Sequence, residues 1–278
     1  MVLAAAVLWG TTGTSRALAP SGAAPLAVGA VRIALGGAIL LVIALSRGTL
    51  LGRPWPIGPA ALSALAVAAY QLAFFEGVAR AGVAVGTIVA IGSAPVFAGV
   101  LGWAVLRERP TARWVLATAV ALAGVVLLAA PTARAFDALA VVLPLGAGGA
   151  YAVYATASKR LVAAGDSAAA AAIAFAGGAL LLVPVLASSD HAWLREPRGV
   201  AVAAWLGIGA TAVAYLLFTR GLARLPVSHS ATLSLAEPLT ATVLGTVVLG
   251  ESLAAPQIAG AALVAAGLLL LATAPRAS

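Results

Sequence analysis

The sequence predicts an all-α membrane protein with ten transmembrane helices in two inverted five-helix repeats. Three observations predict this class: the mean hydropathy is +1.11, only 9% of residues are charged, and long apolar stretches recur from end to end. A helix rises about 1.5 Å per residue, so each stretch is long enough to cross a hydrocarbon core of about 30 Å. A soluble domain would hold roughly one quarter charged residues, and a membrane β-barrel would alternate apolar and polar residues.

Prolines, glycines and charges divide the chain into ten predicted spans. The connections between them are short, so we expect no sizeable soluble domain. The N-terminus lacks the basic region and cleavage site of a signal peptide, and we expect it to form the first span. The predicted spans cover residues 2–19, 26–46, 56–79, 84–106, 112–130, 138–160, 168–188, 199–222, 227–249 and 256–274.

The positions of Lys and Arg predict that both termini are cytoplasmic, because short cytoplasmic loops carry the excess of basic residues. The net charge of +8 is therefore a topology signal for a multi-pass protein of a bacterial inner (plasma) membrane. The expected partners are the lipid bilayer and a small-molecule substrate, with no nucleic acid, in a monomer or homodimer. The ten expected inner residues are Arg47, Arg53, Arg107, Arg109, Arg113, Lys159, Arg160, Arg220, Arg224 and Arg276. The four expected outer residues are Arg80, Arg134, Arg195 and Arg198.

An internal repeat relates the two halves of the chain. Residues 95–108 share eight identities in fourteen positions with residues 238–251, at an offset of 143, and a further match at an offset of 144 relates residues 74–83 to 218–227. The halves are residues 1–131 and 132–278. Each half has five predicted spans, an odd number, so the second half must cross the membrane in the opposite sense. Inverted repeats of this kind are typical of carriers that bind substrate near the bilayer midplane.

Glu237 is the strongest candidate for a substrate-binding residue. It is predicted near the centre of the ninth span, where a carboxylate costs several kcal/mol. On a continuous helix it would share one face with Ser230 and Ser234, and Pro238 would free backbone carbonyls of the preceding turn. The carboxylate would bind a substrate ammonium or carry a proton. The alternative is a protonated Glu bonded to a neighbouring helix.

Aromatic residues at helical spacing predict a lined cavity for an amphipathic or aromatic solute. Residues three and four apart share a helix face, and the sets fall in matching spans of the two halves. The alternative is ordinary packing between helices or against lipid. The candidate lining residues are Trp9, Tyr70, Gln71, Phe74, Tyr151, Tyr154, Tyr215 and Phe218.

Other polar and proline residues lie inside predicted spans. Pro95 and Pro238 occupy paired positions in the two repeats and are candidate hinges, because proline interrupts helix hydrogen bonding. Arg16, Arg32 and Glu76 would lie at similar depth near the outer face. They would form an outer gate or a carboxylate anchor, or alternatively extend to the interface, with Glu76 paired to a basic residue four positions later.

The remaining charged and ligand-type residues indicate structural roles. Glu108 and Glu251 are predicted at helix ends, one inner and one outer, accepting bonds from backbone donors of the next helix. The chain has no cysteine, and His191 and His229 are far apart in the sequence, so we expect no metal and no cofactor.

Several short motifs resemble the drug/metabolite transporter superfamily, EamA type. They are Leu8-Trp9-Gly10, Val31-Arg32, the Gly250-Glu251 turn with its counterpart Arg107-Glu108, and a glycine in each fifth span. The resemblance covers the whole chain and implies a ten-helix inverted-repeat fold that exports amino acids, other metabolites or toxic organic molecules. Its general look is most similar to the aromatic amino-acid exporters of bacterial inner membranes. The first half departs from the pattern, since Arg107 stands where the second half has Gly250.

The sequence therefore predicts a secondary carrier, not an enzyme, that exports small metabolites by alternating access. Amino acids with aromatic or other hydrophobic side chains are the expected substrates. The alternative is a multidrug or toxic-compound efflux carrier. An integral-membrane enzyme would need clustered His, Asp or Glu at an interface, which the sequence lacks, and midspan prolines favour alternating access over a static channel.

Overall fold

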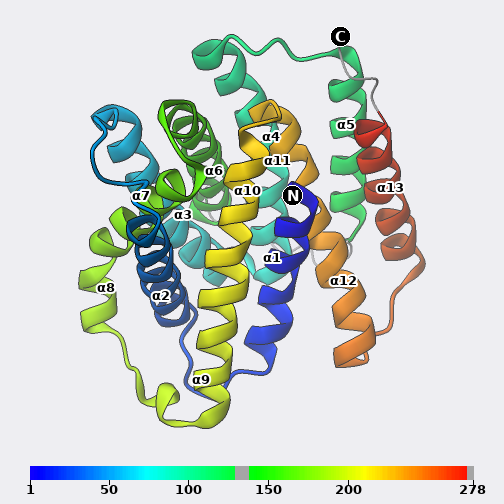
Figure 1. Cartoon of the computed structure of the whole chain (residues 1–278). Helices are drawn as coiled ribbons and strands as arrows, with labels where there is room; N and C mark the ends of the chain where they lie inside the picture. The colour runs from blue at the N-terminus through cyan, green and yellow to red at the C-terminus, as the bar shows by residue number, and fades with distance from the viewer. Residues whose placement is uncertain (129–137, 274–278) are drawn as a thin grey trace.

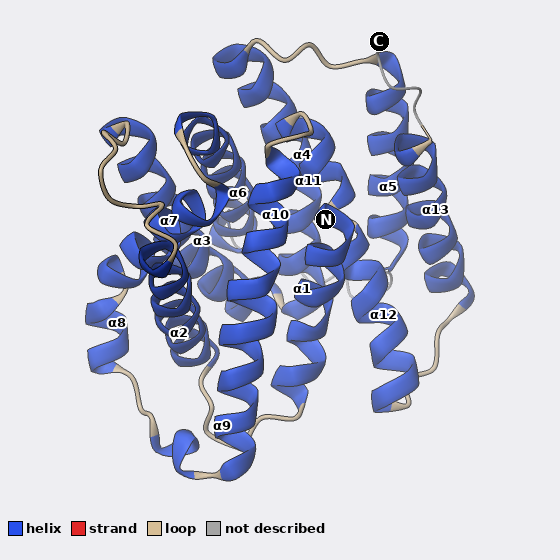
Figure 2. Ribbon diagram, viewed as in Figure 1, coloured by secondary structure: helices blue, strands red, loops and turns tan. Residues whose placement is uncertain are grey.

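The computed structural model describes residues 1–128 and 138–273, and every regular element in these ranges is helical (Figure 2). The predicted all-helical class is therefore confirmed for this part of the chain. The first half contains α1 (Val2–Ala17), α2 (Pro25–Ser46), α3 (Ile57–Ala81), α4 (Val83–Leu106) and α5 (Ala112–Leu128). The second contains α6 (Ala138–Ala164), α7 (Ser167–Leu181), α8 (Val183–Ser188), η1 (Ala192–Arg195), α9 (Pro197–Ala204), η2 (Trp205–Val213), α10 (Ala214–Leu222), α11 (Val227–Leu233), α12 (Ala236–Leu249) and α13 (Ala255–Ala272).

Helices occupy all ten predicted spans, and seven described segments are long and apolar enough to cross a membrane. The other three predicted spans hold the shorter helices α1, α5, and α7 followed by α8. The ends of the fifth and tenth predicted spans, together with Arg134 and Arg276, lie outside the described residues. The seven segments are Pro25–Ser46, Ile57–Ala81, Val85–Leu106, Ala138–Ala164, Pro197–Leu222, Val227–Leu249 and Ala255–Ala272.

Helices from opposite halves of the chain pack against one another (Figure 1). Helix α3 runs along α6, α2 along α7, α1 along α12, and α5 along α13. Small residues permit this close approach, as in other membrane bundles. A methyl group added at Gly260 of α13 would lie 2.7 Å from the carbonyl oxygen of Gly124 in α5. The two halves are thus interleaved, and their shared interior holds the candidate site.

Helix α7 is unusual because its buried face consists almost entirely of alanine. Residues 168–172 and Ala174 are all alanines with at most 1% of their surface exposed. A methyl side chain has no rotamers to lose on burial, and it lets neighbouring backbones approach. Gly37 of α2 accordingly sits against the Phe175 backbone, where an added methyl group would meet the carbonyl oxygen at 2.7 Å.

Two spans of the second half are irregular. Residues 205–213 form a π-helix between α9 and α10, a form usually seen only in short pieces and frequently at functional sites. The ninth predicted span breaks, because α11 ends at Leu233 and α12 begins at Ala236. Pro238 cannot donate to Ser234, whose carbonyl oxygen instead accepts from the Glu237 backbone N–H at 2.9 Å. Pro95, by contrast, lies inside the continuous helix α4.

The turns that end α4 and α12 have the same geometry. Arg107 and Gly250 both adopt left-handed backbone conformations, with φ of 60° and 71°. The next residues, Glu108 and Glu251, each donate their backbone N–H to a carbonyl six residues earlier, at 3.0 and 3.1 Å. Arg107 therefore takes the conformation of its glycine counterpart, which costs a non-glycine residue about 1–2 kcal/mol.

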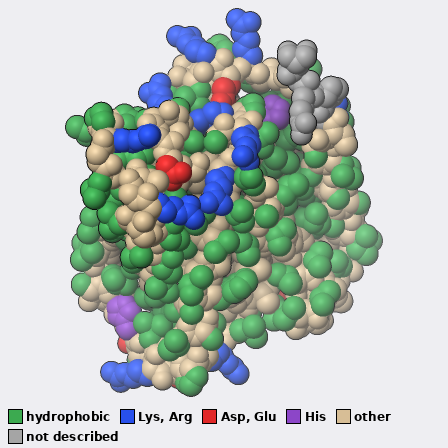
Figure 3. All heavy atoms as spheres, viewed as in Figure 1, with side chains coloured by type: hydrophobic (Ala, Val, Ile, Leu, Met, Phe, Trp, Pro, Cys, Tyr) green, Lys and Arg blue, Asp and Glu red, His purple; other side chains and the backbone are tan. Residues whose placement is uncertain are grey.

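Basic side chains are unevenly distributed over the face seen in Figure 3. Most Lys and Arg side chains of this view gather toward the upper end, few lie at the lower end, and hydrophobic side chains cover the band between them. A broad apolar band between charged ends is the pattern of a surface that contacts lipid.

Candidate functional site

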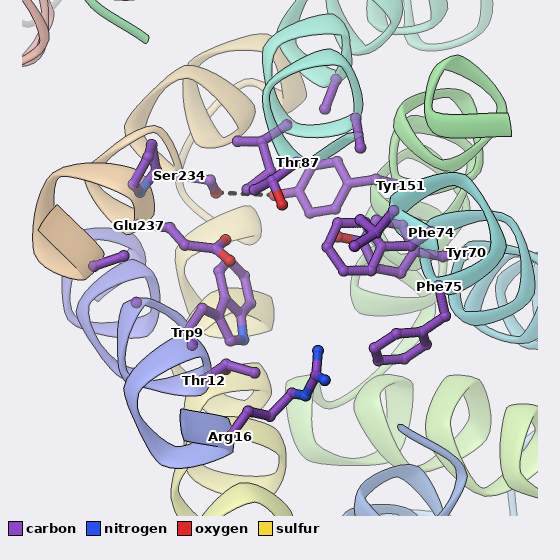
Figure 4. A pocket seen from close by; sticks show the side chains of 18 of the residues that line it. Trp9, Thr12, Arg16, Tyr70, Phe74, Phe75, Thr87, Tyr151, Ser234 and Glu237 are labelled. Carbon is purple, nitrogen blue, oxygen red and sulfur yellow. Dashed lines mark hydrogen bonds between the residues drawn. The ribbon is translucent and has the colours of Figure 1, made fainter. Parts of the chain in front are cut away.

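A cavity of about 230 Å³ lies in the shared interior of the two halves (Figure 4). Its walls come from helices α1, α2, α3, α4, α6 and α10 and from the broken α11–α12 segment. The lining extends from Ser234 and Glu237 to Arg16, Val78 and Thr87, which lie where α1 and α3 end and α4 begins. The cavity therefore extends toward one end of the bundle.

The helix break presents Glu237 to this cavity. Glu237 is the second residue of α12, and its side chain points into the space beside Trp9 (Figure 4). Within the described ranges, its carboxylate has no hydrogen-bond or ion-pair partner. On the same segment, the Ser234 hydroxyl forms a 2.9 Å hydrogen bond with the hydroxyl of Tyr151 from α6. This bond connects the residues between α11 and α12 to helix α6 on the other side of the cavity.

Two arginines also line the cavity, Arg16 and Arg32, which the sequence offered as an outer gate or a carboxylate anchor. The Arg32 guanidinium donates one long hydrogen bond, 3.4 Å, to the side-chain oxygen of Gln71. Gln71 in turn donates to the Gly29 carbonyl oxygen at 3.0 Å, which fixes its amide. The buried Arg32 Nε has no partner within the described part of the chain. Arg16 points into the cavity from α1 (Figure 4).

Aromatic rings form most of the remaining wall. Tyr70 and Phe74 of α3 stack with their centroids 5.4 Å apart. Across the cavity, Tyr215 contacts Trp9 at 4.8 Å and Phe175 at 4.0 Å between centroids. The site is thus an apolar, aromatic space with one carboxylate, two guanidinium groups and a few hydroxyls.

The predicted site residues fall into three groups. Those that line the main cavity are Trp9, Tyr70, Phe74, Tyr151, Tyr215, Ser234, Glu237 and the candidate hinge Pro238. Gln71 and Tyr154 line a smaller adjoining cavity. Ser230, Phe218 and Pro95 line neither cavity.

Local geometry explains the two substrate-site residues that lie elsewhere. Ser230 is fully buried and lines neither cavity, and its carbonyl oxygen accepts from both the backbone N–H and the hydroxyl of Ser234, at 3.1 and 3.0 Å. Phe218 is fully buried behind the wall, with its ring 5.3 Å from that of Trp9. Both therefore support the lining instead of forming it.

Of the three charges predicted near the outer face, Glu76 takes the ordinary structural role. Its carboxylate pairs with Arg80 four residues later at 2.8 Å, and both side chains are exposed. Over residues 1–128 and 138–273, no group of three or more His, Cys, Asp or Glu side chains could hold a metal ion.

The end of the bundle away from Arg16 and Thr87 is tied by ionic and backbone contacts. Glu108, just after α4, pairs with Lys159 of α6 at 2.7 Å and accepts the Val227 backbone N–H of α11 at 2.8 Å. Glu108 was predicted to accept from a backbone donor of the next helix, α5, but the donor is instead Val227 at the start of α11, a helix of the second half. Its counterpart Glu251 is exposed, and its carboxylate makes no such bond within the described structure.

Comparison with known proteins gives consistent matches over the whole chain. Residues 1–130 and 138–273 match the EamA-like transporter family. The protein named uncharacterized transporter YwfM of Bacillus subtilis is 45% identical over 278 aligned residues, 99% of this chain and 93% of that protein. The threonine/homoserine exporter RhtA of Escherichia coli K12 is 29% identical over 93% of this chain and 85% of that protein. The probable terminal-alkyne amino-acid exporter of Streptantibioticus cattleyicolor is 29% identical over 65% of this chain and 61% of that protein. A solved crystal structure of 24% identity shares the fold, with a TM-score of 0.82 over 98% and 94% of the two chains.

Proposed function

The chain belongs to the EamA-like transporter family, and we propose that it is a secondary carrier that exports amino acids across the bacterial inner membrane. The preferred substrates have apolar or aromatic side chains. One observation carries this proposal: Glu237, whose carboxylate has no partner within residues 1–128 and 138–273, and Arg32, whose guanidinium has a single long hydrogen bond there, line the same aromatic cavity. Charges left unpaired inside a membrane bundle mark substrate or ion pathways.

An α-amino acid satisfies both charges together. Its ammonium would donate to the Glu237 carboxylate, and its carboxylate would accept from Arg32, with Arg16 as a second cation. Charge-assisted hydrogen bonds of this kind are roughly twice as strong as neutral ones. The aromatic wall of Tyr70, Phe74 and Tyr215 would then contact the side chain. The two charges thus supply recognition of the backbone, and the aromatic rings supply preference among side chains.

The cavity volume favours amino acids over large drugs. At about 230 Å³ it is smaller than the roughly 300–1,000 Å³ that is usual for sites of drug-sized ligands. Two relatives also carry the names of amino-acid exporters. A multidrug carrier remains the second candidate, favoured by the aromatic lining.

Alternating access through a ten-helix inverted repeat accounts for the architecture. The family matches each half of the chain in turn, and the turns after α4 and α12 repeat the same backbone geometry 143 residues apart. A broken helix beside the substrate site is a common feature of carriers with inverted repeats. In this arrangement both termini lie in the cytoplasm, and the end of the bundle with Arg16 and Thr87 faces outward.

The substrate proposal is tested in proteoliposomes loaded with labelled leucine or phenylalanine. We expect efflux to be inhibited by the free amino acids, weakly by their N-acetyl derivatives, which lack the ammonium, and weakly by their methyl esters, which lack the carboxylate. Equal inhibition by all three forms would contradict recognition of both charges. Transport of cationic drugs without transport of any amino acid would favour the multidrug alternative.

The orientation is tested with single cysteines in this cysteine-free chain. A membrane-impermeant thiol reagent added to intact cells should label Ser21→Cys, between α1 and α2. It should label Arg109→Cys, between α4 and α5, only after the membrane is permeabilised. The reverse pattern would overturn the proposed orientation.

A further inference from the structure

Three segments meet at the end of the bundle opposite the Arg16 side of the cavity. Glu108 and Lys159 form a 2.7 Å ion pair, with 18% and 25% of their side-chain surfaces exposed. Glu108 also accepts the Val227 backbone N–H, and the Lys159 ammonium also donates to the Leu225 carbonyl oxygen. The next residue, Arg160, donates to the Val105 carbonyl oxygen at 3.1 Å. The ends of α4 and α6 are thereby tied to each other and to the start of α11.

The same set of groups occurs a second time in the sequence. At an offset of 143, Glu251 corresponds to Glu108, and Ser15-Arg16 corresponds to Ser158-Lys159. At an offset of 144, Val83, the first residue of α4, corresponds to Val227, the first residue of α11. A carboxylate, a cation and a helix start are therefore available at each end of the bundle.

Only one of the two sets is assembled in this structure. Glu251 is exposed and its carboxylate has no hydrogen-bond or ion-pair partner in the described ranges. Arg16 points into the cavity (Figure 4), and it has no ion-pair partner among the described residues. The unassembled set lies at the end toward which the cavity extends, and the assembled set lies at the opposite end. The two facts agree with a bundle closed at one end and open at the other.

We propose that the two sets are gates that close alternately during transport. The α6 gate, Glu108 with Lys159, is closed in this structure. The α1 gate, Glu251 with Arg16, closes in the opposite conformation, when Glu251 also accepts the Val83 backbone N–H and the α6 gate separates. This inference rests on the proposed alternating access and identifies the residues that stabilise each conformation.

Each gate stabilises one conformation, because its carboxylate and cation are in bonding distance in that conformation and separate in the other. Glu108 couples two halves of the chain, since it lies after α4 and its partners lie in α6 and at the start of α11. Its removal leaves Lys159 partly buried with only backbone acceptors and leaves an unmet backbone donor, so it destabilises this conformation relative to the other. Removal of the Glu251 carboxylate breaks nothing here, so the same substitution at the two positions should shift the equilibrium in opposite directions.

A cysteine reporter at Thr87 measures this shift without any substrate. Thr87 lines the cavity near the beginning of α4, at the end toward which the cavity extends. Thr87→Cys is labelled from outside with an impermeant methanethiosulfonate in the cysteine-free chain. We expect Glu108→Gln and Lys159→Gln each to slow labelling at least threefold. Glu251→Gln should leave the rate unchanged or raise it, and the matched control Glu196→Gln, an exposed carboxylate ahead of α9, should leave it unchanged.

Cross-linking tests the α1 gate directly. In Arg16→Cys with Glu251→Cys, a short bifunctional thiol reagent should join the two cysteines, and joining them should slow labelling of a third cysteine at position 87. Adding Glu108→Gln should raise the yield of the cross-link. Unchanged labelling in both α6-gate variants, or a cross-link yield that Glu108→Gln does not raise, would reject the gates. Labelling shifts in a protein that moves no amino acid would instead reject only the proposed substrate.

Discussion

Substitution of Glu237 by glutamine separates substrate recognition from a purely structural role. Glutamine keeps the size and hydrogen-bonding capacity of the side chain but removes its charge. A hydrogen bond to a charged group contributes about 1.5–3 kcal/mol, against about 0.5–1.5 kcal/mol for a neutral pair. Among the described residues the carboxylate has no partner to lose, so the change acts on the ligand. We expect amino-acid binding to weaken by about 1–2 kcal/mol, or roughly 5- to 30-fold in Kd.

Trp9 offers a direct measurement of this change, because its ring lines the cavity beside Tyr215. Substrate titrations followed by tryptophan fluorescence in detergent give Kd for Glu237→Gln and for Glu196→Gln, the exposed control. Counterflow between two filled compartments then distinguishes the two roles of the carboxylate. Loss of net efflux with surviving exchange would indicate proton coupling, since exchange need not return an empty carrier. An unchanged Kd together with unchanged net efflux would refute the reasoning.

Three further predictions concern the helices around the site. Pro95→Ala and Pro238→Ala should both slow transport at normal expression, and unchanged rates in both would remove hinging from the mechanism. Arg107→Gly should raise stability by about 0.5–1 kcal/mol, since it removes a left-handed arginine while adding backbone freedom to the unfolded chain; a lower melting temperature in detergent would contradict this. Gly260→Ala should destabilise by about 1–2 kcal/mol, because its methyl group meets the α5 backbone. Gly146→Ala, where nothing lies within 4 Å, should instead stabilise by up to about 1 kcal/mol; equal melting temperatures for the last two variants would show that the close contact does not matter.

The sequence was sufficient to predict the features that follow from a lipid environment. Hydropathy predicted the helical class and where most of the described helices lie, because lipid leaves the backbone few other options. The same reasoning selected Glu237, because an isolated carboxylate in a span is costly, and the structure places its side chain against the cavity. The conformation of the turn after α4 was harder to predict, because Arg107 adopts a left-handed backbone conformation that glycine favours and its own side chain gives no indication of it.

Other parts of the site depend on tertiary structure. Ser230 was predicted to share a face with Glu237, but that reasoning assumed an unbroken helix. The two cavity arginines were visible in the sequence as charges inside spans. Periodicity alone could not distinguish an arginine that extends to the interface from one that points inward. Phe175 packs against Tyr215 from an alanine-rich helix without polar residues to orient it, so its place in the wall had no sequence signal.

The alanine face of α7 has a consequence for how this protein can diverge. Over residues 168–172 every position is buried and filled by a single methyl group, so this stretch has no larger side chain to shorten in compensation when one residue grows. Added methylenes in a packed interior cost about 1–3 kcal/mol, a large share of what holds a protein folded. Residues 168–172 should therefore tolerate few substitutions by larger residues. Changes of substrate must arise on the cavity walls of α1, α3 and α12, whose side chains face open space and can change size without moving a helix.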